Sequence, residues 1–283
     1  MTNFTPITKE NISFIQEYFK KDRSGFCDFT PFVLLMWQKM YKTEFAADDS
    51  VLYLRYEMDG KHRYAMLCDC VKTALAPLKE LNDELGLTLV CENGIKALEE
   101  LGEEFTVETD EGWWDYVYLH EDLANLKGKK YAGQRNHINK LESVHSDWKY
   151  EKITPDNAIY VAEFFDKIFS PTDDETHNFE GDMVKKYLSD FSALPMLGGF
   201  VSAGGKIISF ALGEILSDTL FVHVEKADRG VQGAYPIIVR EFARANPASF
   251  INREEDMGIP GLRTSKLSYH PHKFLKKHNV TFK

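Results

Sequence analysis

His223 and Glu225 lie one residue apart on a segment that is predicted to be a strand. Residues 219–224 alternate in character and are rich in β-branched and aromatic types. Because successive side chains of a strand point to opposite faces, His223 and Glu225 project to the same face. A carboxylate raises the pKa of a nearby imidazole and orients the ring, which suits a general base. The alternative is a His–Glu pair that satisfies only itself on a half-buried strand.

A polar turn at 225–233, with two glycines, follows this strand, and the apolar spacing of 234–244 predicts a helix. The first turn of a helix leaves backbone N–H groups unpaired, and its dipole favours negative charge. A phosphate or carboxylate is therefore a candidate ligand here. The candidate contacts are Lys226, Arg229, Gly233 and Tyr235. Loose glycine motifs are weak evidence, so a plain strand–turn–helix connection is the alternative.

The segment 250–271 holds the densest polar set of the chain and carries two glycines. Polar residues on loops beside strand ends commonly form sites in α/β folds. Asp256 is a third candidate base, and we expect an extended conformation at His270 because Pro271 follows. The candidate ligand contacts in this segment are Asn252, Arg253, Arg263, Lys266 and Tyr269. A surface loop with internal ion pairs among these residues is the alternative.

The segment 121–140 is the densest basic run in an otherwise acidic chain. It leads into a predicted helix around 131–142. Arg135 is the candidate phosphate contact of this run, since the guanidinium fork matches phosphate oxygens. A solvated helix that connects two domains is the alternative.

The elements around these residues alternate between helices and short strands. The first half reads roughly as ααββαβαββ, with helices at 5–23, 32–41, 73–85 and 93–101 and a hairpin turn at 58–61. The second half reads roughly as βααβββαβ with a helical and basic tail; its predicted helices include 157–170 and 182–191, and its strands 148–153, 197–203, 207–215 and 249–252. This order predicts an α/β (α+β) fold with a structural duplication.

Composition limits the function classes. The chain has 283 residues and a formal net charge of −10, which argues against non-specific binding of nucleic acid by the whole molecule. We expect reduced, mostly buried thiols from its four cysteines, and no metal motif or covalent nucleophile stands out. The sequence shows neither a signal-peptide pattern nor an apolar run near 18 residues, so a cytoplasmic protein is expected.

The order of helices, three-stranded meander, glycine turn and helix resembles the Gcn5-related acetyltransferase fold. The matching turn is Arg229-Gly230-Val231-Gln232-Gly233-Ala234. In that family such a turn holds the pyrophosphate of coenzyme A, and its fourth position is glycine. Gln232 stands at that position here, which weighs against use of coenzyme A.

Three longer runs resemble bacterial proteins related to the C-terminal domain of phosphatidylglycerol lysyltransferases. They are GKKYAGQRNHINKLE (128–142), VHVEKADRGVQGAY (222–235) and FINREEDMGIPGLRTSKLSYHP (250–271). Those domains have two acetyltransferase-like folds in tandem, as do the Fem-type aminoacyl transferases. The resemblance implies an N-terminal domain at 1–126, a basic connecting helix at 127–145 and a C-terminal domain at 146–283, each domain with a mixed, mainly antiparallel sheet.

Three hypotheses follow. The first is an acyl or aminoacyl transferase in which aminoacyl-tRNA is the donor, an amine or hydroxyl is the acceptor, and His223 or Glu225 is the base. The second is a coenzyme A-dependent N-acetyltransferase. The third is a non-catalytic module that binds a charged small ligand. The sequence fixes neither the acceptor nor the oligomeric state.

Overall fold

The computed structural model describes residues 3–58, 60–81, 85–193 and 196–283. Within them the chain forms two compact units, each discontinuous in sequence. Unit 1 contains the residues up to Tyr116 together with Glu254–Arg263 and Phe274–Lys283, and unit 2 contains Val117–Arg253 and Thr264–Lys273. The sequence-based division at residues 126 and 145 stays a prediction.

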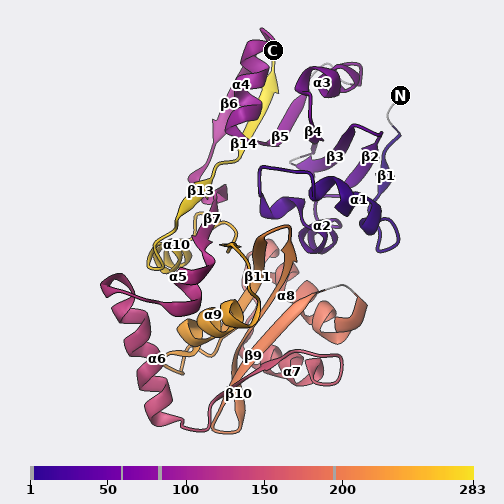
Figure 1. Ribbon diagram of the computed structural model, residues 1–283. Helices are drawn as coiled ribbons and strands as arrows, with labels where there is room; N and C mark the ends of the chain where they lie inside the picture. The colour runs from indigo at the N-terminus through magenta and orange to yellow at the C-terminus, as the bar shows by residue number, and fades with distance from the viewer. Residues whose placement is uncertain (1–2, 59, 82–84, 194–195) are drawn as a thin grey trace. The chain divides into compact units, whose positions relative to one another are not determined.

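Unit 1 is built on a seven-stranded sheet (Figure 1). Its strands, in spatial order, are β1 (Thr5–Pro6), β2 (Glu44–Ala47), β3 (Val51–Met58), β4 (Lys61–Cys68), β5 (Gly86–Val90), β14 (His278–Phe282) and β6 (Phe105–Thr109). The helices of this unit are α1 (Ile12–Phe19), α2 (Pro31–Trp37), α3 (Val71–Lys79) and α4 (Glu92–Glu100). Tyr53, Leu75 and Leu87 are members of its apolar core, which brings β3, α3 and β5 together.

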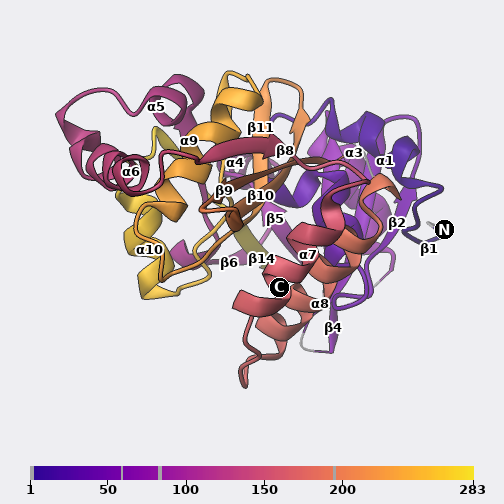
Figure 2. The same ribbon diagram turned by 90° about the horizontal axis from the view of Figure 1, so that it is seen from below.

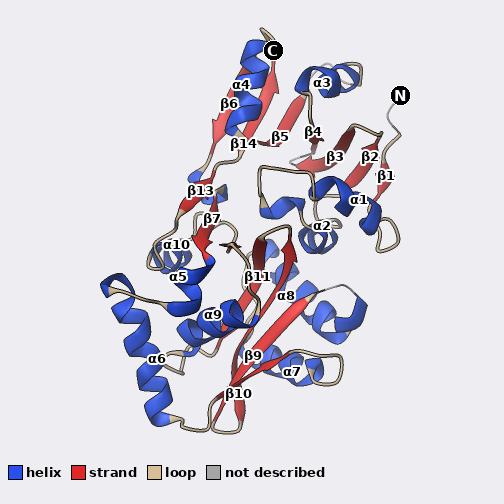
Figure 3. Ribbon diagram, in the orientation of Figure 1, coloured by secondary structure: helices blue, strands red, loops and turns tan. Residues whose placement is uncertain are grey.

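A second seven-stranded sheet carries unit 2 (Figure 3). Its spatial order is β13 (Lys273–Leu275), β7 (Asp115–Leu119), β12 (Phe250–Asn252), β11 (Thr219–Ala227), β10 (Lys206–Leu216), β9 (Leu197–Ala203) and β8 (Lys149–Lys152). The helices of this half are α5 (His120–Asn125), α6 (Ala132–Val144), α7 (Ala158–Ile168), α8 (Glu175–Ser189), α9 (Ala234–Ala245) and α10 (Pro260–Leu267), the last of which crosses the boundary between the units.

The two sheets share one topology. In each, a three-stranded antiparallel meander is followed by one parallel strand, β5 beside β4 and β12 beside β11. The next strand is antiparallel and distant in sequence: β14 from the C-terminus joins the first sheet, and β7 from the first half joins the second. The predicted α/β class with mixed, mainly antiparallel sheets is therefore confirmed.

Helices cover both faces of the second sheet (Figures 1 and 2). The ring of Phe242, on α9, lies 3.3 Å from the point where a Cβ at Gly213 of β10 would be. Phe164 and Phe165 of α7 pack edge-on against Phe210 of the same strand. Positions 210 and 213 of β10 differ by an odd number of residues, so they face opposite sides. This packing fixes β10 and its neighbour β11 between two apolar layers.

Several predicted boundaries were wrong. β11 runs to Ala227, so Glu225 and Lys226 lie on the strand instead of in the turn. The segment after β12 contains α10, and the tail ends in β14 instead of a helix. His270 has φ of 54°, which is left-handed and not extended. The helix at 182–191 begins earlier, at Glu175, where the side chain of Asp174 caps two backbone N–H groups.

Parts of two other predictions lie outside the described residues. They are Asp59 in the hairpin turn between β3 and β4, and residues 82–84 at the end of the helix predicted at 73–85. None of the helices within the described ranges is both long and apolar enough to cross a lipid bilayer.

Candidate functional site

β11 and β12 pair in parallel over only three residues, and this short pairing creates the candidate site. Thr219, Leu220 and Phe221 lie beside Phe250, Ile251 and Asn252. β12 then ends, while β11 continues to Ala227. From residue 222 onward, β12 therefore no longer lies beside β11. This stretch of β11 carries His223, Glu225 and Lys226.

A β-bulge lies where the candidate base His223 sits. The register between β10 and β11 shifts between Leu212, which lies beside Val224, and Gly213, which lies beside Val222. His223 is the extra residue, and such bulges redirect a side chain. Its Nε2 lies 3.0 Å from Oε1 of Glu214, and the two side chains are only 1% and 6% exposed. The carboxylate partner of His223 in this structure, Glu214, comes from β10 and was not recognised in the sequence.

Glu225 pairs with Arg253, the first residue after β12. Nε and Nη2 of Arg253 donate to Oε2 of Glu225 at 3.0 and 2.5 Å. The guanidinium also lies over two tyrosine rings, 4.7 Å from the centroid of Tyr269 and 5.7 Å from that of Tyr118. The predicted residues Glu225, Arg253 and Tyr269 are thus brought together, and β7 adds Tyr118.

The guanidinium of Arg253 is buried and incompletely paired. Its side chain is 6% exposed, and within the described residues its Nη1 has no hydrogen-bond partner. Burial opposes the charge, but Glu225 and the two tyrosines outweigh it and raise the pKa of Arg253. Arg253 is therefore a permanent buried cation whose Nη1 has its N–H bonds to offer to an oxygen.

Lys266, another predicted residue, holds Arg253 in place. Nζ of Lys266 donates to the backbone oxygen of Arg253 at 2.5 Å, and the hydroxyl of Tyr118 donates to the backbone oxygen of Lys266 at 2.8 Å. Asn252, on β12 immediately before Arg253, is fully buried. Lys226 lies next to Glu225 on β11 and pairs with Glu180 of α8 at 2.9 Å. Lys266 and Lys226 therefore have protein partners in this structure.

Several backbone N–H groups of the turn after β11 are already hydrogen-bonded to acceptors within the turn. The N–H groups of Gly230, Val231 and Ala234 bond within the turn. A Cβ at Gly233 would lie 2.4 Å from the backbone oxygen of His137 on α6, and φ there is 93°. Close packing of α6 against the start of α9 is thus sufficient reason for this glycine. Arg229 and Tyr235 are both exposed beside the turn.

Asp256 and Arg263 belong to unit 1 and pair with each other. Nε of Arg263 donates to Asp256 Oδ2 at 2.7 Å, the Tyr116 hydroxyl donates to the same oxygen at 2.5 Å, and the N–H of Gly258 donates to Oδ1 at 2.8 Å. Burial opposes the charge on Asp256, but these donors lower its pKa overall. The ionised form is stabilised, and this weakens Asp256 as a base.

The predicted basic run divides in two. Nη1 of Arg135 donates to the backbone oxygens of Leu126 and Gly128 at 2.5 and 2.7 Å, so it holds the turn that precedes α6. Lys130 pairs with Asp122 at 3.0 Å. Lys127, Lys129 and Lys140 are exposed. Lys130 is exposed as well but is paired, so Lys127, Lys129 and Lys140 are the lysines of the run that remain for a ligand.

Unit 1 also contains a buried ionic cluster that sequence reasoning missed. Nζ of Lys277, 4% exposed, lies 2.6 Å from both Asp28 and Asp115 and 3.4 Å from Glu255. Cys27 Sγ lies 3.4 Å from Asp115. The ligand atoms of Cys27, Asp28 and Asp115 lie close enough to hold a metal ion, but the ammonium of Lys277 already gives these carboxylates a cation. Up to 250 positions separate the members, so no local pattern reveals the cluster.

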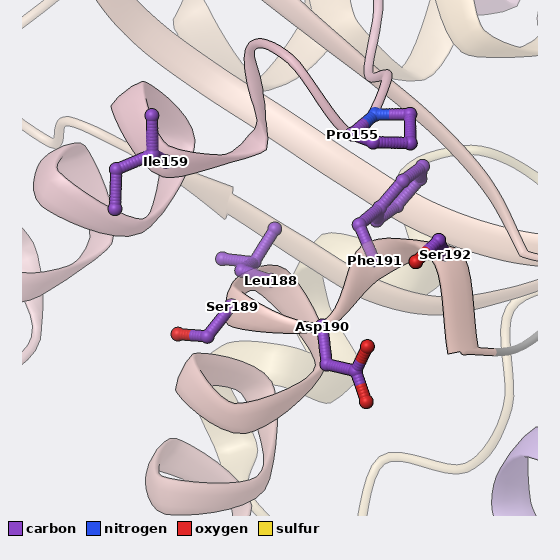
Figure 4. Close-up of a pocket in the computed structure, with 7 residues that line it drawn as sticks. All are labelled: Pro155, Ile159, Leu188, Ser189, Asp190, Phe191 and Ser192. Atoms are coloured by element: carbon purple, nitrogen blue, oxygen red, sulfur yellow. The ribbon is translucent and has the colours of Figure 1, made fainter.

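A cavity of about 170 Å³ lies between the start of α7 and the end of α8 (Figure 4). The ring of Phe191 points towards Pro155, and the carboxylate of Asp190 points away from them. Sites for small molecules usually measure about 300–1,000 Å³. The seven lining residues include none of the candidates named above, so the chemistry is not assigned to this cavity.

The family model for the C-terminal region of phosphatidylglycerol lysyltransferases matches residues 29–281. The chain belongs to this family. A comparison with curated protein sequences gives no match. The family assignment thus confirms the resemblance that the three sequence runs indicated.

Solved structures extend this result to the fold. A conserved protein of unknown function from Bacteroides thetaiotaomicron is 35% identical over 100% of both chains, with a TM-score of 0.94. The C-terminal domain of a putative lysylphosphatidylglycerol synthetase from Agrobacterium fabrum is 10% identical, with a TM-score of 0.64 over 97% of this chain and 92% of that one. FemX is 9% identical, with a TM-score of 0.62 over 98% and 96%. The lysyltransferase family member described here therefore has the tandem fold that these proteins share.

Proposed function

We propose that this chain is an aminoacyl transferase, with aminoacyl-tRNA as donor and a hydroxyl or amine group as acceptor. Membership of the lysyltransferase family supports the reaction class. The observation that carries the proposal is Arg253, a buried guanidinium beside a carboxylate, whose Nη1 has no hydrogen-bond partner among the described residues. Acyl transfer needs such a donor for the oxygen on which negative charge develops, and a nearby proton acceptor.

The proposed reaction is direct. The acceptor oxygen or nitrogen attacks the carbonyl carbon of the aminoacyl ester, the new bond forms, and the C–O bond to the terminal ribose breaks. The acceptor proton passes to Glu225 and then to the departing ribose oxygen. Nη1 of Arg253 donates to the carbonyl oxygen while it carries negative charge.

Glu225 is a better proton acceptor than His223 for geometric reasons. The His223 side chain is 1% exposed and its Nε2 contacts Glu214, whereas the Glu225 side chain is 15% exposed. Both hydrogen bonds from Arg253 end on Oε2 of Glu225, which leaves Oε1 for a proton. We assign His223 a positioning role, in which its contact with Glu214 fixes the bulge that aims Glu225.

The exposed lysines of the basic run are suited to bind the phosphates of the tRNA donor. Lys127, Lys129 and Lys140 precede or lie on α6, which packs against the start of α9 through Gly233. Lysine contacts with phosphates release counterions, so binding weakens as salt rises. A basic segment of this size suits a tRNA backbone despite the formal net charge of −10.

The test is a transfer assay with tRNA charged with labelled amino acids. Two kinds of acceptor are offered. Vesicles that contain phosphatidylglycerol are chosen because the name of the family contains this lipid, and a panel of soluble amines is tested beside them. Label transfer to either acceptor by the wild type, with at least about a hundredfold loss in Glu225→Gln, supports the proposal. Acetyl-coenzyme A replaces charged tRNA in a parallel arm. Acetylation without aminoacyl transfer would overturn it in favour of an acetyltransferase.

A further inference from the structure

Three of the four cysteines gather at one end of two neighbouring strands in unit 1. Cys68 is the last residue of β4, and Cys91 directly follows β5. The strands are parallel with Tyr64 beside Leu87, so four residues further along each strand the chain reaches Cys68 and Cys91. Cys70 occupies the N-cap position of α3. The expectation of mostly buried thiols was wrong, because Cys27 alone of the four is buried and Cys70 is exposed.

Cys70 has the surroundings of a reactive thiolate. The hydroxyl of Thr73 donates to its sulfur at 3.4 Å. This hydrogen bond, with the backbone N–H groups of Thr73 and Lys72 and the charge of Lys72, lowers the pKa of Cys70. Thiolates, not thiols, react with peroxides and disulfides, and thiolates are stabilised at helix N-termini.

Cys68 provides a second thiol beside it. Burial raises the pKa of Cys68 to about 11, and the neighbouring sulfurs of Cys70 and Cys91 act in the same direction. The backbone N–H of Cys70 acts on this pKa in the opposite direction, and a single residue separates the two cysteines in the chain. A low-pKa, accessible cysteine next to a second thiol is the arrangement that resolves a sulfenic acid into a disulfide.

We propose that Cys70 is a peroxide-reactive thiol and that Cys68 resolves its oxidised form into a disulfide within the chain. In the first step the Cys70 thiolate attacks hydrogen peroxide, the O–O bond breaks, and Cys70 sulfenic acid and hydroxide form. In the second step the Cys68 sulfur attacks the sulfenic sulfur, the S–O bond breaks, and a disulfide and water form. Peroxide is the two-electron oxidant, and a small thiol or a dithiol reductant reverses the change.

The arrangement favours a disulfide over a metal site. A group of three ligating atoms that lie within 4.8 Å of one another is found in the described residues only at Cys27, Asp28 and Asp115. The disulfide would link the end of β4 to the first turn of α3. It would also engage the sulfur of Cys70, the N-cap residue of this helix.

The sequence makes the test direct, because trypsin releases residues 64–72 as one peptide that contains both thiols, whereas Cys91 lies in the peptide 80–96. The reduced full-length chain is treated with stoichiometric hydrogen peroxide, remaining thiols are alkylated, and the digest is analysed by mass spectrometry. The expected product is peptide 64–72 lighter by two hydrogen atoms and unalkylated, restored by a dithiol reductant.

Matched variants separate the roles. Cys68→Ser should leave a sulfenic acid on Cys70 that dimedone traps, and Cys91→Ser should behave as wild type. Thr73→Val, nearly isosteric, should slow alkylation of Cys70, while the buried Cys27 stays the slowest thiol in every variant. A peroxide-treated chain in which Cys70 remains fully alkylatable would overturn the proposal. Cross-linked peptides 64–72 and 80–96 would overturn the assignment of Cys68.

Discussion

Both hydrogen bonds that Arg253 donates to Glu225 end on one oxygen, Oε2, from Nε at 3.0 Å and from Nη2 at 2.5 Å. The contact therefore uses two of the three nitrogens of the guanidinium and one of the two carboxylate oxygens. Nη1 is buried with no partner among the described residues. A purely structural ion pair would leave this buried donor unsatisfied at a cost of about 1–3 kcal/mol. A substrate oxygen would satisfy it.

Arg253→Lys should therefore lower kcat by about a hundredfold or more with little change in KM for charged tRNA. An ammonium keeps the charge beside Glu225 but has no donor nitrogen at the fixed position of Nη1, and removal of one such donor costs about 10²–10³ in rate. Steady-state transfer kinetics measure kcat and KM separately, and circular dichroism checks that the variant is folded. Arg244→Lys, at a half-exposed arginine of α9, is the matched control. Equal activity in both variants would remove Arg253 from the chemistry.

The pair His223–Glu214 should matter more to stability than to the reaction. Glu214→Leu leaves the buried imidazole without its carboxylate, so we expect a loss of about 1–3 kcal/mol in the free energy of unfolding. Urea denaturation measures it, with Glu151→Leu at a 40%-exposed carboxylate as the control. In a double-mutant cycle, His223→Leu should cost clearly less in the Glu214→Leu background than in the wild type. Strict additivity would mean that the two side chains do not interact.

Gly233→Ala tests the packing of α6 against α9. The new Cβ would lie 2.4 Å from the His137 backbone oxygen and 2.9 Å from Leu141 Cβ, at a φ of 93° that alanine rarely adopts. We expect a loss of about 2–4 kcal/mol in unfolding free energy. Gly133→Ala, on α6 with no atom near its Cβ position, should be neutral or stabilising by up to about 1 kcal/mol. Similar thermal melting of both variants would contradict this contact.

Much of the fold followed from local patterns, because strands such as β9 to β11 and the helix α9 have clear periodicity and turn residues. The candidate site was predicted only in part. Glu225 and Arg253 were identified as polar residues near strand ends, but their pairing depends on where β12 stops beside β11. Glu214 was missed because a bulge, which has no sequence signature here, sets the register that brings it to His223.

The other contacts that sequence reasoning missed arise because each half of the chain contributes a strand to the sheet of the other half. Tyr118 reaches Arg253 because β7 joins the second sheet beside β12, and Lys277 reaches Asp28 because the C-terminal segment returns to the first unit. Pairings between strands so distant in sequence are specified by the whole set of core contacts. Periodicity within one segment carries no information about them.

The buried cluster around Lys277 predicts a pH dependence of stability. Burial, Glu255 and Asp115 raise the pKa of Asp28 to about 6, against the opposing charge of Lys277. The folded state thus binds a proton on Asp28 more tightly than the unfolded state, whose ordinary value is 3.8. The stability from this group is present at pH below about 4 and is lost as pH rises through about 6. The pKa of Lys277 is raised well above 10.5 by its acidic neighbours although burial opposes its charge, so Lys277 stays charged throughout this window.

Asp28→Asn removes this titration while it keeps the shape of the side chain. The unfolding free energy of the variant minus that of the wild type should therefore grow as pH rises from about 4 to 8, by at most about 3 kcal/mol. Lys277→Met should show the opposite trend, because loss of the ammonium leaves carboxylates that repel one another more strongly once they ionise. Urea denaturation at several pH values measures both differences, and titrating groups outside the cluster cancel in the subtraction. Parallel curves for wild type and Asp28→Asn would show that Asp28 titrates normally and that the cluster does not couple its charges.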